Sequence, residues 1–465
     1  MSDHELERVL RGTLRETLDH QVGPHSLWAG SPAARRVADE RRSRGRLPLR
    51  LLAVAALIAA GGGAALLGGA LSPSPDLSSE AQNGWIALTV AQPDPVTQDL
   101  DGDTDIFLVG LDREPRLVIG TDTDDVNQLC PAFSPDGRSL AYGRVEGHGS
   151  DLSGPAAYQG AALVVADIAD DGRASDRLTI DIGDGVPPPC PVWSPDGGRV
   201  AFGVNKTSPI NPDTSAAGSE VWLVTLADRS TTVLPDLLAT DIDWSPDGSQ
   251  LAIASGQREL DSGNALQDGR IYLYEPSSGA LRSLDATAGT YHLTWSPDGK
   301  RIAYQARDVL RVIDPVTQSQ QVLDTGAGAI HGIGPVWSPD GKTIAYQRLL
   351  GSSGERHEVV LVTPGDTSDG TPAASERVIP ALQLDTQGSP WHIYPFRVTW
   401  SPDGRYLLYL AWSTERSVGV LAAAVPTDAE KPMLVLPELA GLVPYDGYDD
   451  TSFVPIQTWA RRPAS

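Results

Sequence analysis

The sequence predicts an all-β protein built from a repeated unit of four short strands, and two observations carry this prediction. The first is an aromatic residue followed by Ser-Pro-Asp-Gly, which occurs six times, beginning at Phe133, Trp193, Trp244, Trp295, Trp337 and Trp400. The starts are 60, 51, 51, 42 and 63 residues apart, and self-similarity at such a period is typical of circular or stacked repeats. The second is that each motif precedes a strand-like run, such as residues 301–305, and then a second apolar run. Each unit therefore matches one blade of a β-propeller.

The residue types of the motif favour a tight hairpin turn over a catalytic role. Pro presets φ for a turn, Asp and Ser accept backbone N–H bonds, and Gly takes the positive φ at the exit. The bulky aromatic residue ends the preceding strand, and we expect its ring to be buried between neighbouring units. The Asp and Ser of the motif are accordingly interpreted as turn residues.

The six motifs, each followed by a strand of the Leu/Ile-Ala-Tyr/Phe type, resemble the TolB-type (WD40-like) β-propeller repeat over residues 83–462. The resemblance implies a propeller and an extracytoplasmic setting. It implies no single activity, because the fold hosts binding platforms, sensors and enzymes.

The two ends of the repeat region predict how the ring closes. The run beginning at Gly84 matches the second strand of a unit, although no motif precedes it. The run around Trp459 matches the strand that leads into a motif. We expect the two to form one composite unit, which removes the free sheet edges of an open array. The prediction is a seven-bladed propeller, with six or eight blades as the alternatives.

The segment before the repeats predicts a membrane anchor. Residues 35–50 hold seven Arg and lead into the uncharged run 51–71, which is long enough to cross a bilayer as a helix. Arg on its N-terminal side predicts a cytoplasmic N-terminus and an extracytoplasmic propeller. We therefore divide the chain into a cytoplasmic segment (1–48), a single transmembrane helix (49–71), a linker (72–82) and the propeller (83–462). A signal peptide is the alternative for the apolar run, but its charged region would be far too long.

Residues 4–20 carry Leu at four-residue intervals, which predicts a short amphipathic helix. It either packs on the protein or docks a cytoplasmic protein partner. The layout weakly resembles membrane regulators of extracytoplasmic-function sigma factors. No Cys precedes position 130, so the zinc-binding motif of many such domains is absent.

The net charge restricts the kinds of partner that the chain can bind. The net charge is −24, and an acidic propeller argues against nucleic acid as a partner.

Cys130 and Cys190 each stand three residues before a motif aromatic, in successive units. In an oxidising compartment they either form a disulfide or remain two buried thiols too far apart to bridge.

A candidate ligand-binding site is predicted on the propeller face away from the motif turns, where the loops entering the inner strands meet. The residues that precede inner strands there are Asp241, His292, His331, Trp391, His392, Tyr394 and Arg397. Aromatic faces with a few polar groups suit a small molecule, an oligosaccharide or a loop of a partner protein. The alternative is ordinary loop packing.

The sequence predicts neither a cofactor nor a metal site. The acidic run 99–105 lacks the order and the distal Glu of a calcium loop. No Gly-x-Ser-x-Gly or phosphate-binding loop occurs. The favoured function is a non-catalytic, membrane-anchored sensor or scaffold of a bacterial envelope. The alternatives are a propeller hydrolase or lyase acting on an envelope polymer, and an anti-sigma-like regulator acting through residues 1–48.

Overall fold

The computed structural model describes the strands of the repeat region and the turns around them. The described residues are 83–91, 104–109, 116–119, 126–146, 159–169, 172–186, 189–204, 219–255, 269–284, 287, 289–306, 309–324, 334–350, 356–365, 375–379, 392–393, 398–413, 418–424, 433–434 and 457–461. All the regular elements in these ranges are β-strands. Within them no helix is long and apolar enough to cross a membrane. The expected cytoplasmic segment, transmembrane helix and linker (1–82) lie outside the described residues.

The repeated unit is a four-stranded antiparallel sheet in which strands follow one another in chain order. One such sheet consists of β4 (Val126–Phe133), β5 (Ser139–Glu146), β6 (Gln159–Ile168) and β7 (Ala174–Gly183). Another consists of β15 (Thr290–Trp295), β16 (Ile302–Ala306), β17 (Val309–Ile313) and β18 (Gln320–Asp324). The motif forms the turn between the first and second strands in both of these units, that is, between β4 and β5 and between β15 and β16.

Two larger sheets arise where neighbouring units share a strand or are joined by a short bridging strand. A seven-stranded sheet is built around β11 (Ser230–Trp244), with β8 (Val192–Trp193), β9 (Arg199–Val204) and β10 (Ser219–Thr225) on one side and β12 (Leu251–Ser255), β13 (Arg270–Glu275) and β14 (Ala280–Leu284) on the other. The first half of β11 pairs with β10 and its second half with β12. This strand therefore ends one unit and begins the next without a break.

The nine-stranded sheet contains two units joined by a short bridging strand. The first unit is β19 (Val336–Trp337), β20 (Ile344–Leu350), β21 (Arg356–Thr363) and β22 (Ser375–Ile379). The second is β24 (Thr399–Trp400), β25 (Leu407–Ser413), β26 (Val418–Ala424) and β27 (Met433–Leu434). Between them β23 (His392–Ile393) pairs with both β21 and β25.

The remaining sheet joins the two ends of the repeat region. It has the order β28 (Gln457–Arg461), β1 (Asn83–Ala91), β2 (Thr104–Val109) and β3 (Arg116–Ile119). Ile86 of β1 lies opposite Trp459 of β28 in an antiparallel register. The expected composite unit, completed by the strand around Trp459, is thus confirmed.

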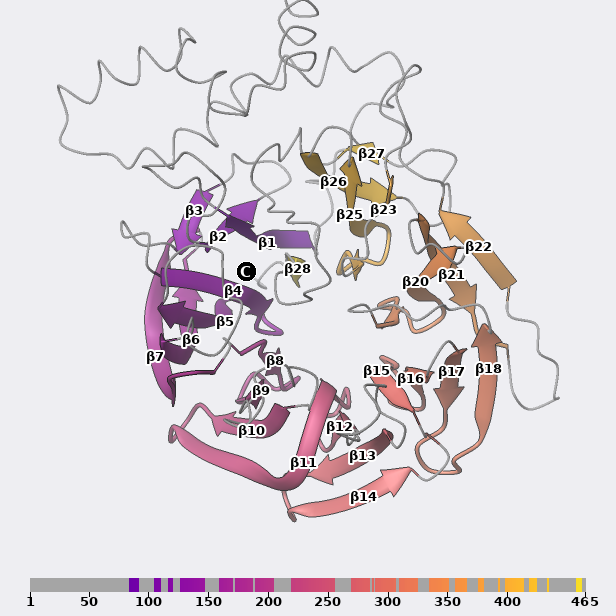
Figure 1. The fold of residues 1–465 in the computed structure, drawn as a ribbon, viewed down its shortest axis with the longest axis horizontal. Coiled ribbons are helices and arrows are strands. Elements are labelled where there is room, and N and C mark those ends of the chain that lie inside the picture. The colour runs from indigo at the N-terminus through magenta and orange to yellow at the C-terminus, as the bar shows by residue number, and fades with distance from the viewer. Residues whose placement is uncertain are drawn as a thin grey trace, which may run out of the picture.

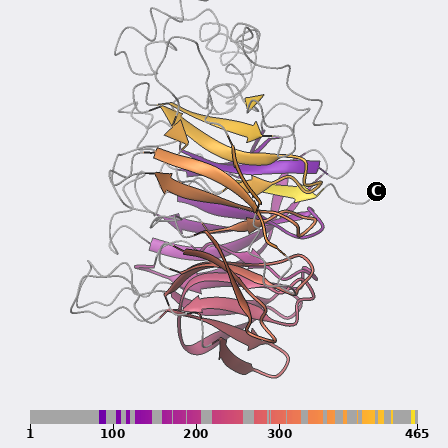
Figure 2. The same ribbon diagram turned by 90° about the vertical axis from the view of Figure 1, so that its right-hand side faces the viewer.

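The sheets are arranged around a common centre, as Figure 1 shows, and form a disc when viewed from the side in Figure 2. The first strand of each unit contacts the first strand of the next in the order β28, β4, β8, β11, β15, β19, β24. Strand β24 also contacts β28, which closes the circuit.

The core lies between successive sheets. One cluster packs Phe202 and Val200 of one unit against Leu163 and Val165 of the unit before it. Four motif Trp residues belong to such clusters (Trp193, Trp244, Trp295 and Trp337), and all five motif Trp residues are 4–9% exposed. The expected burial of the aromatic ring between units is therefore confirmed for the Trp residues.

The motif turns have the hydrogen bonding that the sequence predicts. In the turn after β15, Ser296 Oγ donates to Asp298 Oδ1 (2.6 Å), which also accepts from Lys300 N (3.1 Å). Gly299 has φ +70°. These bonds to Ser296 and to the turn backbone lower the pKa of Asp298 against the effect of burial. The carboxyl is thereby held in its charged form as a turn acceptor.

The motif turns also hold neighbouring units together. A Cβ added to Gly299 would lie 3.8 Å from Cδ of Pro246, the motif Pro of the preceding unit. The same contact recurs between Gly341 and Pro297, at 3.6 Å. In addition, Trp193 Nε1 donates to Ala132 O (2.9 Å) across the unit boundary.

Candidate functional site

The candidate site is formed by residues three positions before the motif aromatic on successive inner strands. Asp241 lies near the end of β11 and His292 lies on β15, one unit further round the ring. His292 Nδ1 is 3.5 Å from Asp241 Oδ2, and the two side chains are 18% and 16% exposed. The structure therefore brings together two of the residues that the sequence singled out.

Asp241 and Asp243 satisfy backbone donors along the free edge of β15. Strand β15 pairs with β16 on its other side. Leu293 N donates to Asp241 Oδ2 (3.1 Å), and Trp295 N donates to Asp243 Oδ2 (2.7 Å). The two carboxylates thus link β11 to β15, in place of the strand pairing that an inner edge lacks.

Asp243 has an unusual electrostatic environment. Burial is the largest effect on its pKa, and the nearby charge of Asp241 acts in the same direction. Bonds from Trp295 N, Thr294 Oγ1 and Trp244 N oppose them, and the net result raises the pKa of Asp243 to about 6. Burial and, to a lesser extent, repulsion by the Asp241 carboxylate therefore favour protonation of Asp243 below about pH 6.

Gly334 occupies the equivalent position in the following unit and packs against His292. A Cβ added to Gly334 would lie 2.8 Å from His292 Cβ and 3.7 Å from Asp241 Oδ2. Any larger residue would displace the imidazole. The absence of a side chain at 334 therefore leaves the room in which His292 stands beside Asp241.

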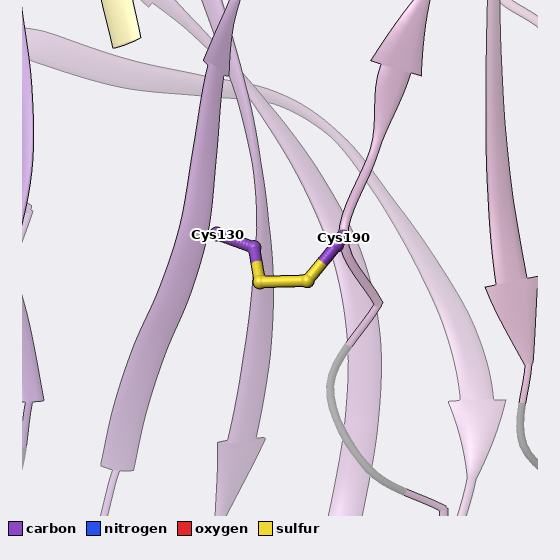
Figure 3. The surroundings of a disulfide bond; sticks show 2 residues. All are labelled: Cys130 and Cys190. Carbon is purple, nitrogen blue, oxygen red and sulfur yellow. A yellow bond between two sulfur atoms is a disulfide. The ribbon is translucent and has the colours of Figure 1, made fainter. Parts of the chain in front are cut away.

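At the same position in two other successive units, the structure contains the Cys130–Cys190 disulfide (Figure 3). The two Cα atoms are 4.9 Å apart. Of the two alternatives left open by the sequence, the structure thus has the bridge. Cys130 lies on β4 and Cys190 just before β8, so the bond joins two neighbouring inner strands.

The other predicted site residues are not placed in this way. His331, Trp391, Tyr394 and Arg397 lie outside the described residues. His392 belongs to β23, where its backbone is opposite Trp412, and its side chain is not described. Whether these residues join Asp241 and His292 stays a prediction.

The sequence reasoning missed Asp243, Thr294 and Gly334. Asp243 and Thr294 stand immediately before motif aromatics, so alternation along a strand places Asp243 on the same face as Asp241. That periodicity was a usable signal. Within the described ranges, no cluster of three or more His, Cys, Asp or Glu side chains is arranged to hold a metal ion. The described part of the site offers a carboxylate pair and an imidazole, which can accept and donate hydrogen bonds.

Comparison with known proteins gives structural likeness without a family assignment. No family model matches the chain, and no curated protein matches it. Among solved structures, TolB from Acinetobacter baumannii is 20% identical, with 68% of each chain covered and a TM-score of 0.40. The periplasmic gluconolactonase of Pseudomonas aeruginosa is 15% identical, with 81% of this chain and 99% of that one covered and a TM-score of 0.49. A protein of unknown function from Desulfotomaculum acetoxidans is 12% identical, with coverage of 80% and 98% and a TM-score of 0.49. Since these scores are below 0.5, the description of the fold rests on the strand order and contacts of this chain.

Proposed function

We propose that the chain is a non-catalytic binding protein of a bacterial envelope, with a closed seven-bladed propeller as its binding domain. The blade count is supported by the circuit of inner strands from β28 to β24 and back. The ligand-binding site is the inner-strand position occupied by Asp241 and His292. The observation that carries this assignment is that a carboxylate and an imidazole pair there while both stay partly exposed.

The chemistry of the pair favours a ligand rich in hydrogen-bond donors. A carboxylate accepts bonds, and an imidazole held at Nδ1 leaves Nε2 for a second partner. Hydroxyl groups of an oligosaccharide meet these requirements, as do amide groups of a peptide or partner loop. His331, His392, Trp391, Tyr394 and Arg397 would supply the aromatic and polar surroundings in this proposal.

The placement outside the cytoplasm is part of the same proposal. Residues 49–71 anchor the chain as a single transmembrane helix, with residues 1–48 in the cytoplasm and the propeller outside. The disulfide supports an oxidising compartment for the propeller. Carbonate extraction of membranes tests the anchor: the full chain should stay in the pellet, and deletion of residues 49–71 should release it.

Binding is tested on the purified full chain with an array of soluble bacterial-envelope oligosaccharides. At least one probe should bind, and Asp241→Asn and His292→Gln should each weaken that binding by about tenfold or more, the effect of losing a hydrogen bond to a charged group. Asp228→Asn is the matched control and should leave binding unchanged. Asp228 lies in the exposed hairpin turn between β10 and β11, at the end of their pairing that is remote from Asp241. Binding indifferent to both site variants would overturn the site, and absence of binding to every oligosaccharide would overturn a sugar as its ligand.

A second candidate, a hydrolase or lyase acting on an envelope polymer, is favoured by the same pair, because a carboxylate beside Nδ1 orients an imidazole for general acid–base work. The oligosaccharides recovered from the binding assay distinguish the two. Shortened products that disappear in His292→Gln would establish catalysis, and recovery of intact probes supports binding alone.

A further inference from the structure

A cavity lies at the other end of the inner strands, between the unit β15–β18 and the unit β19–β22. Its volume is about 490 Å³, within the range of small-molecule sites. The walls come from the motif turns after β15 and β19, the hairpin between β17 and β18, and the end of β21. It is thus on the face of the motif turns and separate from Asp241 and His292.

The cavity collects positive charge on a strongly acidic chain. The protein has a net charge of −24 and only four lysines, at positions 206, 300, 342 and 431. Two of the four, Lys300 and Lys342, line this cavity together with Arg301. Lys342 Nζ lies 3.6 Å from Asp340 Oδ2 and its side chain is 77% exposed, an arrangement that holds the ammonium group only weakly.

Arg301 has a structural role in the wall. Its guanidinium donates to Gly341 O (3.4 Å) and lies 4.9 Å from the centre of the Trp337 ring. These contacts tie the β15 unit to the β19 unit and hold together two lining residues of the cavity, Arg301 and Gly341. The two lysines remain as the cations that can turn to a ligand.

The two carboxylates of the cavity are engaged in their own turns. Asp298 accepts from Ser296 Oγ and Lys300 N. Asp314 accepts from Val316 N (2.7 Å) and Thr317 N (2.9 Å). With both charged, the three cations leave a surplus of one positive charge among the lining residues, and Asp340, which lies outside the lining, offsets it through its exposed contact with Lys342. In both lining carboxylates Oδ1 already accepts two hydrogen bonds from its own turn.

The lining also offers polar groups for a hydroxylated ligand. Gln321 Oε1 is buried and has no hydrogen-bond partner in the structure, and an unsatisfied buried acceptor is unfavourable. The hydroxyl-bearing Ser319 and Thr363 line the same space. Because Gln321 Oε1 is shielded from solvent, a ligand hydroxyl reaches this acceptor only when the amide turns towards the cavity.

We propose that this cavity binds a small hydroxylated anion, whose carboxylate or phosphate is neutralised by Lys300 and Lys342 and whose hydroxyl groups meet Gln321 and its neighbours. This site is additional to the one assigned above and does not depend on it.

Three probes that share a sugar ring and differ in charge test the proposal on the full chain: glucuronate, glucose 6-phosphate and glucose. In calorimetric titrations, at least one anion should bind about tenfold or more tightly than glucose, and its affinity should fall as salt is raised. Comparison of the two anions tells a carboxylate site from a phosphate site.

The double variant Lys300→Gln/Lys342→Gln should lose about tenfold or more in affinity for the preferred anion. Arg138→Gln is the control, because Arg138 is an exposed cation at the same turn position of another unit and should leave binding unchanged. Asp241→Asn should also leave it unchanged. An unaltered thermal unfolding midpoint shows that the double variant is folded. Equal binding of glucose, retention of affinity in the double variant, or no saturable binding of either anion would overturn the proposal.

Discussion

His292 contacts Asp241 at the same position within the repeated unit at which Cys190 is bonded to Cys130 in two other units. In each pair the two residues are three positions before the aromatic residue of successive motifs, and the second belongs to the next unit. The contact is 3.5 Å between Nδ1 and Oδ2 in one pair and a covalent bond in the other. Neighbouring inner strands therefore approach closely enough at this position for side chains to link them, and the described part of the chain contains two such links.

Gly334→Ala should disturb the Asp241–His292 pair. The new Cβ would meet His292 Cβ at 2.8 Å, so we expect a loss of about 1–3 kcal/mol in the free energy of unfolding, as for overpacked cores. Chemical denaturation measures it. His292→Gly in the Gly334→Ala background removes the clashing atom and should recover part of that loss; strictly additive effects of the two changes would contradict the contact.

Gly197→Ala and Gly198→Ala form a matched pair in one motif turn. Gly197 has φ +66°, whereas an added Cβ on Gly198 would meet its nearest neighbour at an ordinary 3.4 Å. Because a side chain in the left-handed region is strained, Gly197→Ala should cost about 1–2 kcal/mol of stability. Gly198→Ala should cost little, since Arg138, Ser249 and Lys300 occupy the same turn position in other units. Denaturant midpoints compare the two, and equal effects would contradict the assignment.

Asp243→Asn should change the pH dependence of stability. The folded protein raises the pKa of Asp243 from 3.8 to about 6, so between these values the folded state binds a proton that the unfolded state does not. The stability of the wild type relative to the variant should therefore increase as pH falls from 7 towards 5, by about 1–2 kcal/mol at about 1.4 kcal/mol per pKa unit. Unfolding curves at pH 7, 6 and 5 measure it. A difference that is flat or of opposite sign would contradict the raised pKa.

Removal of the disulfide should destabilise the propeller. The bond closes a sequence separation of 60 residues, for which the loop-entropy argument gives a loss of about 4 kcal/mol. Cys130→Ser/Cys190→Ser should show this loss in chemical denaturation. Reduction of the wild type should match the variant, and reduction of the variant itself should have no effect. A variant as stable as the oxidised wild type would show that the bridge constrains nothing.

Deletion of residues 457–465 should open the ring, because β1 loses β28 and β24 loses its neighbour. We expect lower stability and faster proteolysis of the first unit, in which Ile86, Ile106 and Leu108 are fully buried. Deletion of residues 462–465 alone keeps β28 and is the control. Identical digestion patterns for the two truncations would argue against closure through this strand.

The repeated motif predicted the units and their turns because both depend on local chemistry that recurs in the sequence. The strand-like runs at Gly84 and around Trp459 predicted the composite closing sheet. The continuity of β11 through two units was not predictable, since residues 230–244 read as a weak strand, a connection and a second strand. The contact between Asp241 and His292 depends on how close successive strands come, which no local pattern encodes. Binding residues were expected on the face away from the motif turns, whereas the cavity beside Lys300 and Lys342 lies among those turns. Residues of the turns were interpreted as structural, and that role does not prevent their side chains from also forming a pocket wall.

The pairing of β28 with β1 also sets an order of events during biosynthesis. Residues 83–91 emerge early, yet β28, their neighbour on the inner side of the sheet, arrives only after some 370 further residues have been made. Until then the first sheet presents an unpaired hydrogen-bonding edge to whatever surrounds the nascent chain, and such an edge invites intermolecular association. Escape from aggregation therefore depends on how quickly the last residues are delivered.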